Sequence, residues 1–288
     1  FFLTTGDGMK RISIPLKSGI TLSALQGGNG QPLIMIHGWS QSAEEWRENA
    51  EALTDNRKVI ALDMRGHGES ETPTHGYRVY RLAQDLHEVL NQLNISNVDL
   101  MGHSMGCAVI WAYLDLFGSD RITRLVLVDQ AASMLPNAEW SDEEKSQFGC
   151  FYETSRDVDE FADSIKACVD LETTIDFVKG FFSPAFPKRS LPFIAEENLK
   201  FPRRYAAHLA RDTAFGDWRD VIQRIQLPTL VFGGESSIFA SESQRWIASQ
   251  IPRAEVEIFS DSEGGSHFMF LENPSRFNAR VISFLASP

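Results

Sequence analysis

Short runs of apolar and β-branched residues alternate with segments of helical periodicity through the first half of this chain. Four of the runs are apolar almost throughout, and they span residues 33–36, 58–63, 98–101 and 125–129. Continuous runs of this kind are typical of strands buried on both faces of a parallel sheet. Two further runs precede them, at 11–15 and 21–26. The alternation predicts an α/β fold with an open, mostly parallel sheet and helices on both of its faces.

Two of the intervening segments carry helix signals. Ser42 is followed three residues later by Glu45, which is the pattern of a capping box and predicts a helix over 42–53. Residues 77–93 carry an apolar stripe at helical spacing, so a second helix is expected there.

The alternation stops after residue 132. From 133 to 219 the chain shows helix-like segments and proline-containing turns, without a convincing strand. Strands resume at 228–232 and 255–259, and a final helix is expected over 274–285. The simplest architecture is one α/β core interrupted by a helical cap, with the core at 1–132 and 220–288 and the cap at 133–219.

Composition excludes several classes of protein. With 43% hydrophobic and 23% charged residues, the chain is neither disordered nor collagen-like. The 39 acidic against 27 basic residues give a net charge of -12, which argues against a nucleic-acid partner. The three cysteines show no C-x-x-C spacing, so we expect neither a disulfide framework nor a zinc site.

The same sequence indicates where the protein resides. No run approaches the roughly 18 to 20 apolar residues of a membrane helix. Residues 1–10 lack the basic segment and apolar stretch of a signal peptide. We therefore expect a cytoplasmic protein without a membrane partner, whose partner is a small molecule. The oligomeric state is not predicted.

The clearest chemical motif is Gly-His-Ser-Met-Gly at 102–106, between an expected strand and an expected helix. A serine on such a tight turn holds its hydroxyl clear of the sheet, and the flanking glycines relieve crowding. The motif predicts Ser104 as a nucleophile, provided that a base accepts its proton. The other interpretation is a glycine-flanked turn with a capping serine.

The best candidate for that base is His267, in a Gly-rich loop between the last strand and the final helix. Its orienting carboxylate should lie between Ser104 and His267 in the chain. Two positions at the carboxyl ends of strands qualify, Asp129 and Glu235. We favour Asp129, because an acid that ends a strand beside the Ser104 turn can reach the same imidazole.

Acyl transfer also needs hydrogen-bond donors aimed at the developing oxyanion. The backbone N–H groups of Trp39, just after the strand 33–36, and of Met105 are placed to supply them. The Trp39 side chain could in addition form a wall of the substrate pocket, or simply pack in the core.

These motifs together resemble the α/β-hydrolase fold family, in its small cap-bearing esterase, lactonase and non-haem haloperoxidase-like branch. The resemblance extends over nearly the whole chain, through His37–Gly38–Trp39, the turn at 63–70, the motif at 102–106 and the loop at 265–268. It implies a central, mainly parallel eight-stranded sheet and a helical cap after the sixth strand.

One position departs from the family pattern. The family usually places its acid after the seventh strand, two residues beyond a Gly-Glu pair, and Ser237 stands there in this chain. Some members, notably haloalkane dehalogenases and cofactor-free dioxygenases, place the acid after the sixth strand, which Asp129 matches. Haloalkane dehalogenases and epoxide hydrolases need an aspartate nucleophile, so Ser104 argues against both.

Aromatic residues concentrate in the expected cap. Fourteen of the 31 lie between Ser133 and Asp220. A small cap cannot bury so many rings within itself, so part of them should face an apolar, ring-bearing substrate. The expected substrate-binding side chains are Trp39, His103, Trp140, Phe182, Phe186, Tyr205 and Phe268.

The resulting hypothesis is a serine hydrolase that cleaves a hydrophobic carboxylic ester or lactone without metal or cofactor. Ser104 would attack, His267 would transfer the proton and Asp129 would hold the imidazole. Three alternatives stay open at this stage: a cofactor-free dioxygenase, a hydrolase of C–C bonds, and a receptor of the same fold that binds a small hydrophobic ligand.

Overall fold

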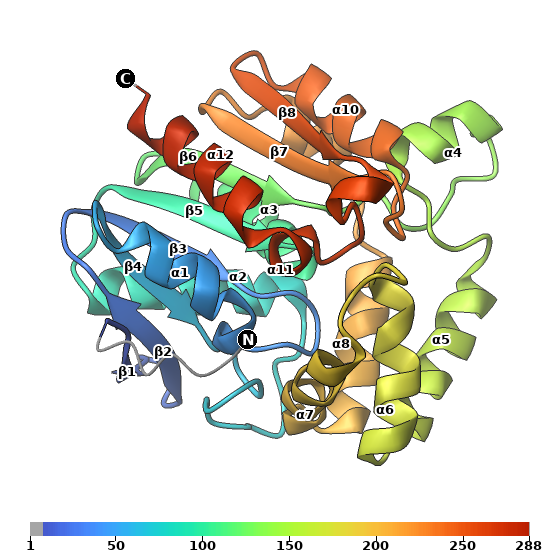
Figure 1. Cartoon of the computed structure of the whole chain (residues 1–288), viewed down its shortest axis with the longest axis horizontal. Helices are drawn as coiled ribbons and strands as arrows, with labels where there is room; N and C mark the ends of the chain where they lie inside the picture. Colours follow the sequence, from blue (N-terminus) through green and yellow to red (C-terminus); the bar gives the residue numbers. More distant parts are fainter. Residues whose placement is uncertain (1–7, 288) are drawn as a thin grey trace.

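An eight-stranded sheet forms the centre of the computed structural model, which describes residues 8–287 (Figure 1). The strands lie side by side in the order β1-β2-β4-β3-β5-β6-β7-β8. The β1–β2 and β2–β4 pairs are antiparallel, and the remaining neighbours are parallel. The strands are β1 Lys10–Pro15, β2 Thr21–Gly27, β3 Gln31–Ile36, β4 Arg57–Leu62, β5 Val98–His103, β6 Ile122–Val128, β7 Thr229–Gly234 and β8 Ala254–Phe259. The expected mainly parallel sheet is therefore confirmed.

The central strands are apolar throughout because helices cover both faces of the sheet. In β3, Ile34 and Ile36 belong to one buried cluster, and the alternate residues Leu33 and Met35 belong to the other. Since successive strand side chains point to opposite faces, a two-sided core requires every position to be apolar. Helices that pack in the first cluster are α2 Val79–Gln92, α3 Met105–Phe117 and α10 Ser241–Gln250. Those in the second are α1 Arg47–Leu53, α11 Met269–Glu272 and α12 Pro274–Ala286.

The chain between β6 and β7 is helical, and we call it the helical segment. It contains no strand among its residues, all of which the structure describes, apart from an isolated bridge between Ser133 and Asp217. Figure 1 shows α5–α8 grouped beside the ends of the parallel strands. Its helices are α4 Asp142–Phe148, α5 Ser155–Ala167, α6 Leu171–Val178, α7 Leu191–Lys200, α8 Arg203–Ala214 and α9 Arg219–Gln223. The division into core and cap at 132/133 and 219/220 stays a prediction.

The helix expected over 42–53 differs in detail from the prediction. A 3-10 turn over Ala43–Trp46 precedes α1, and the Ser42 hydroxyl accepts the N–H of Glu44. Glu45 does not complete a capping box, because its carboxylate turns inward and accepts the N–H of Gly38. Glu45, which the sequence pattern assigned to a helix cap, is thus a buried side chain next to the end of β3.

Within residues 8–287, no helix is long and apolar enough to cross a membrane. The signal-peptide expectation concerns residues 1–10, of which 1–7 lie outside the described part of the chain.

Candidate active site

Ser104 sits on the turn between β5 and α3. Its backbone is held at φ 50° and ψ -120°, a conformation that non-glycine residues rarely adopt. The glycines on either side are required by close packing. A Cβ on Gly102 would lie 2.5 Å from the carbonyl carbon of Gly106, and one on Gly106 would lie 2.4 Å from the Ile36 oxygen.

His267 and Asp129 meet at a short hydrogen bond. The Nδ1–H of His267 donates to the Oδ2 of Asp129 at 2.6 Å, and both residues are buried. Burial lowers the pKa of His267, although the hydrogen bond to Asp129 opposes that shift. The imidazole is therefore mostly neutral at pH 7, which is the form that can accept a proton. The rival acid Glu235 is exposed, and its backbone N–H pairs with Phe259 on the neighbouring strand.

Ser237 occupies the position where the family usually places its acid. Its hydroxyl donates to the Oδ2 of Asp129, the same oxygen that accepts from His267. The other oxygen of Asp129, Oδ1, has no partner within residues 8–287. The family's usual acid position, Ser237, thus lies next to Asp129, and the Ser237 hydroxyl hydrogen-bonds the Asp129 carboxylate.

Two backbone N–H groups are available beside the serine. Met105 is the first residue of α3, so its N–H has no acceptor inside that helix. Neither this N–H nor that of Trp39 has an acceptor among the described residues. Both residues line the same cavity as Ser104 and His267. The arrangement can therefore bind an oxyanion that forms on a carbonyl attacked by Ser104.

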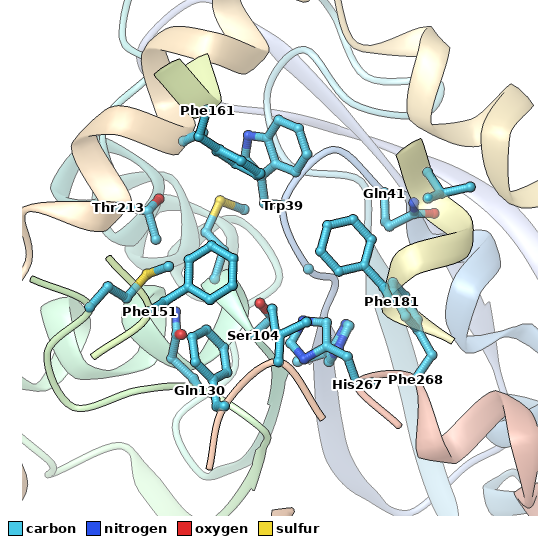
Figure 2. A pocket seen from close by; sticks show the side chains of 18 of the residues that line it. Trp39, Gln41, Ser104, Gln130, Phe151, Phe161, Phe181, Thr213, His267 and Phe268 are labelled. Carbon is cyan, nitrogen blue, oxygen red and sulfur yellow. The ribbon is translucent and has the colours of Figure 1, made fainter. Parts of the chain in front are cut away.

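The cavity that these residues share has a mostly apolar wall rich in aromatic rings, and its volume is about 70 Å³. Figure 2 shows Ser104 and His267 on one side of it, with Trp39 and Phe161 opposite. Further rings in the wall are Phe151, Tyr152, Phe181, Phe239 and Phe268, and polar wall groups include Gln41, Gln130, Asn198 and Thr213.

Only part of the substrate-binding prediction agrees with this wall. Trp39, His103 and Phe268 line the cavity. The other four predicted side chains do not line the cavity, because each of them packs against neighbouring aromatic rings. They are Trp140, Phe182, Phe186 and Tyr205. Trp140 packs on Phe148 under the guanidinium of Arg219, Phe182 stacks between Phe186 and Phe268, and Tyr205 stacks on Tyr77.

Four rings of the wall that the sequence did not single out belong to the aromatic-rich stretch between Ser133 and Asp220, namely Phe151, Tyr152, Phe161 and Phe181. No signal in the sequence separated them from their neighbours, since the helical segment packs rings in several directions. Phe239 lies outside that stretch and was missed for this reason.

A buried pair lies behind the loop that carries Trp39. The Oε1 of Glu45 accepts the N–H of Gly38 at 3.0 Å and lies 3.3 Å from the Nδ1 of His103. The Nε2 of His103 lies 3.1 Å from the carbonyl oxygen of His267, to which it donates. Burial raises the pKa of Glu45 to about 8 and lowers the pKa of His103 to about 4. At pH 7 both groups are mostly neutral, so their 3.3 Å contact is not an ion pair.

Within residues 8–287, no group of three or more His, Cys, Asp or Glu side chains is arranged to hold a metal ion.

A serine on a strand-to-helix turn, together with a histidine held by a buried strand-ending aspartate, defines a hydrolase-type α/β fold. The family model described as "alpha/beta hydrolase fold" matches residues 31–274, and the chain belongs to this family.

Named relatives cover nearly the full chain. A non-heme chloroperoxidase from Kitasatospora aureofaciens is 27% identical over 282 residues, which is 93% of this chain and 97% of that protein. A 2-hydroxymuconate semialdehyde hydrolase from Pseudomonas sp. is 30% identical over 284 residues, 94% of this chain and 92% of that one. Among solved structures, an esterase from Exiguobacterium antarcticum has a TM-score of 0.85 at 24% identity, with 96% and 99% of the two chains covered. At 24% identity, the similarity to this esterase shows the fold alone.

Proposed function

We propose that this protein is a serine hydrolase that cleaves a carboxylic ester or lactone of a small hydrophobic molecule carrying a ring. The observation that carries the proposal is the cavity in which Ser104 and His267 both lie, with His267 held by Asp129 at 2.6 Å. The relative from Pseudomonas sp. is also named a hydrolase, which agrees with the reaction class.

The proposed reaction has two halves. His267 Nε2 accepts the Ser104 proton as Oγ bonds to the substrate carbonyl, and the N–H groups of Trp39 and Met105 bind the oxyanion. The imidazolium returns the proton to the leaving alkoxide, which leaves an acyl-enzyme. Water then attacks in the same way and releases the acid. Asp129 stabilises the imidazolium in both halves through the Nδ1–H bond.

The wall of the cavity supports a small apolar substrate. One water molecule needs roughly 10–15 Å³ of such space. The cavity of about 70 Å³ therefore accepts a group of a few heavy atoms, about the size of one ring. Aromatic rings favour an apolar surface on that group.

The test is hydrolysis of p-nitrophenyl esters and aromatic lactones by Ser104→Ala. We expect kcat to fall by roughly a thousandfold or more. Ser249→Ala is the matched control, because Ser249 is exposed on α10 and its hydroxyl hydrogen-bonds, within residues 8–287, to the Trp246 carbonyl oxygen and the side chain of Gln250. Full turnover by Ser104→Ala would rule out this mechanism. In the same assay Asp129→Asn should lose activity by orders of magnitude, and Glu235→Gln should not.

The position of Asp129 after β6 favours a second candidate, a cofactor-free dioxygenase in which His267 removes a substrate proton before dioxygen reacts. Oxygen dependence separates the two reactions, since hydrolysis proceeds unchanged under nitrogen. Identification of the products would distinguish cleavage of a C–C bond from cleavage of an ester. Binding of the ligand without formation of any product would indicate a receptor.

A further inference from the structure

A second cavity lies between the loop before α2 and helix α8, away from Ser104. Its volume is about 870 Å³, and none of its described lining residues is Asp or Glu. The side chains that give it its character are His75, Arg78, Arg81, Arg204, Tyr205 and His208. We call it the basic groove. A groove with this lining is unexpected in a chain with 39 acidic and 27 basic residues.

Two of its arginines have no carboxylate partner in the described part of the chain. Arg78 makes no side-chain hydrogen bond or ion pair within residues 8–287. Arg204 lies over the ring of Tyr205, with 4.3 Å from its guanidinium carbon to the ring centre, and donates to the Tyr205 hydroxyl. Arg81 differs, because Asp85 and Glu88 bind it at 2.6 and 3.1 Å. Among residues 8–287, therefore, Arg78 and Arg204 line the basic groove without forming an ion pair.

The groove is formed by two parts of the molecule that a ligand would connect. Arg78 and His75 come from the loop that enters α2, and Arg204 and His208 come from α8. Between these parts Tyr77 and Tyr205 stack with ring centres 4.3 Å apart, so the two walls already touch. The distribution of donors on both walls suits a ligand with anionic oxygens at both ends.

We propose that the basic groove binds a small organic or inorganic polyanion, held between the guanidinium groups of Arg78 and Arg204. Guanidinium groups bind phosphate and carboxylate oxygens with paired, charge-assisted hydrogen bonds. Phosphate and carboxylate supply the same anionic-oxygen chemistry, and the experiment below distinguishes them.

Helix α8 links the basic groove to the candidate active site. The Nε1–H of Trp39 donates to the carbonyl oxygen of Ala206 at 2.8 Å, and Ala210 and Thr213 line the catalytic cavity. An anion bound by Arg204 therefore contacts the helix that also binds the Trp39 side chain. The proposal concerns binding, so it does not depend on the reaction at Ser104.

The test is calorimetric titration of the full chain at pH 7 and constant ionic strength, with inorganic phosphate in one arm and citrate in the other. We expect saturable binding at one site, weakened at least about tenfold in the double variant Arg78→Gln, Arg204→Gln. The control is Arg189→Gln, Arg253→Gln, which removes the same charge from two exposed arginines outside the groove.

Tighter binding of one anion assigns the ligand class, and both results support the site. The proposal is overturned if neither anion saturates, if the double variant binds as the wild type does, or if the control pair weakens binding equally. Should the double variant fail to fold, each single variant must still weaken binding several-fold.

Discussion

Two residues of the proposed catalytic group share an unfavourable backbone conformation. Ser104 and Asp129 have φ values of 50° and 52°, in the left-handed region that non-glycine residues seldom occupy. Each directly follows a parallel strand, and the turn brings its side chain to the carboxyl edge of the sheet. Strain of this kind is common where function requires a particular side-chain direction. The hydrogen-bonded pairing of β5, β6 and β7 holds the backbone of both turns in this conformation.

Glu45 gives the clearest pH dependence at the residue scale. Burial raises its pKa from 4.5 to about 8. The folded state therefore keeps a proton that the unfolded chain releases, and stability falls as pH rises from about 4.5 to about 8. Glu45→Gln keeps an acceptor for the N–H of Gly38 without ionising. We expect the variant to gain stability relative to wild type across this window, by up to about 1.4 kcal/mol per pH unit.

Urea unfolding of both proteins at pH 5, 6.5 and 8 measures this difference. The matched comparison is Glu51→Gln on α1, at a partly exposed position beside Arg47. Parallel pH curves for wild type and Glu45→Gln would mean that Glu45 is ionised in the folded protein.

At the scale of the element, the strand–turn–helix unit around Ser104 depends on how closely α3 approaches β3. A methyl group in place of the Gly106 hydrogen would meet the Ile36 carbonyl oxygen at 2.4 Å. Alanine improves helix propensity by at most about 1 kcal/mol. A clash with buried backbone costs about 1–3 kcal/mol, so the clash outweighs the gain.

We therefore expect Gly106→Ala to lower the melting temperature by several degrees, since 1 kcal/mol corresponds to roughly 2–4 °C for a chain of this size. Gly180→Ala is the control, because a Cβ added at Gly180 would have no neighbouring atom within 4 Å. It should leave the melting temperature unchanged or slightly raised. An unchanged value for Gly106→Ala would show that β3 and α3 can move apart.

The elements themselves were largely predictable. The run at 98–101 became β5 at Val98–His103, and the final helix expected over 274–285 became α12 at Pro274–Ala286. These elements are specified locally, by two-sided burial and by a proline at the first helical turn. The capping-box prediction at Ser42 was wrong because Glu45 finds a partner outside its own helix, which local spacing cannot reveal.

At the scale of the whole molecule, the helical segment forms much of the wall of the cavity beside Ser104. Phe161 from α5 packs against Trp39 and Phe177, with ring centres 6.2 and 5.7 Å away. Under the proposed function, Phe161→Ala enlarges the cavity. We expect the ratio of kcat/KM for p-nitrophenyl hexanoate over acetate to rise roughly tenfold.

Phe215→Ala is the control for this change. That ring is 50% exposed and does not line the cavity, so the ratio should stay at the wild-type value. A ratio that is the same in Phe161→Ala and wild type, or that shifts equally in both variants, would place the acyl group elsewhere.

The sequence by itself determined the features that depend on neighbours along the chain. The buried strands, the helices between them, the serine turn at 102–106 and the histidine in its glycine-rich loop all follow from local periodicity and turn chemistry. Both possible acids were also visible, because each follows a strand of the parallel sheet.

Only the tertiary structure shows which of those two acids contacts His267 and which of the aromatic rings face the cavity. Asp129 meets His267 because β6 lies next to β5, and Ser237 on the loop after β7 turns its hydroxyl to the same carboxylate. Phe161 reaches the cavity, whereas Trp140 and Tyr205 pack on other rings. The physical reason is that ring direction in the helical segment depends on how its helices pack on one another. Such packing is set by contacts between residues far apart in the chain, which periodicity does not encode.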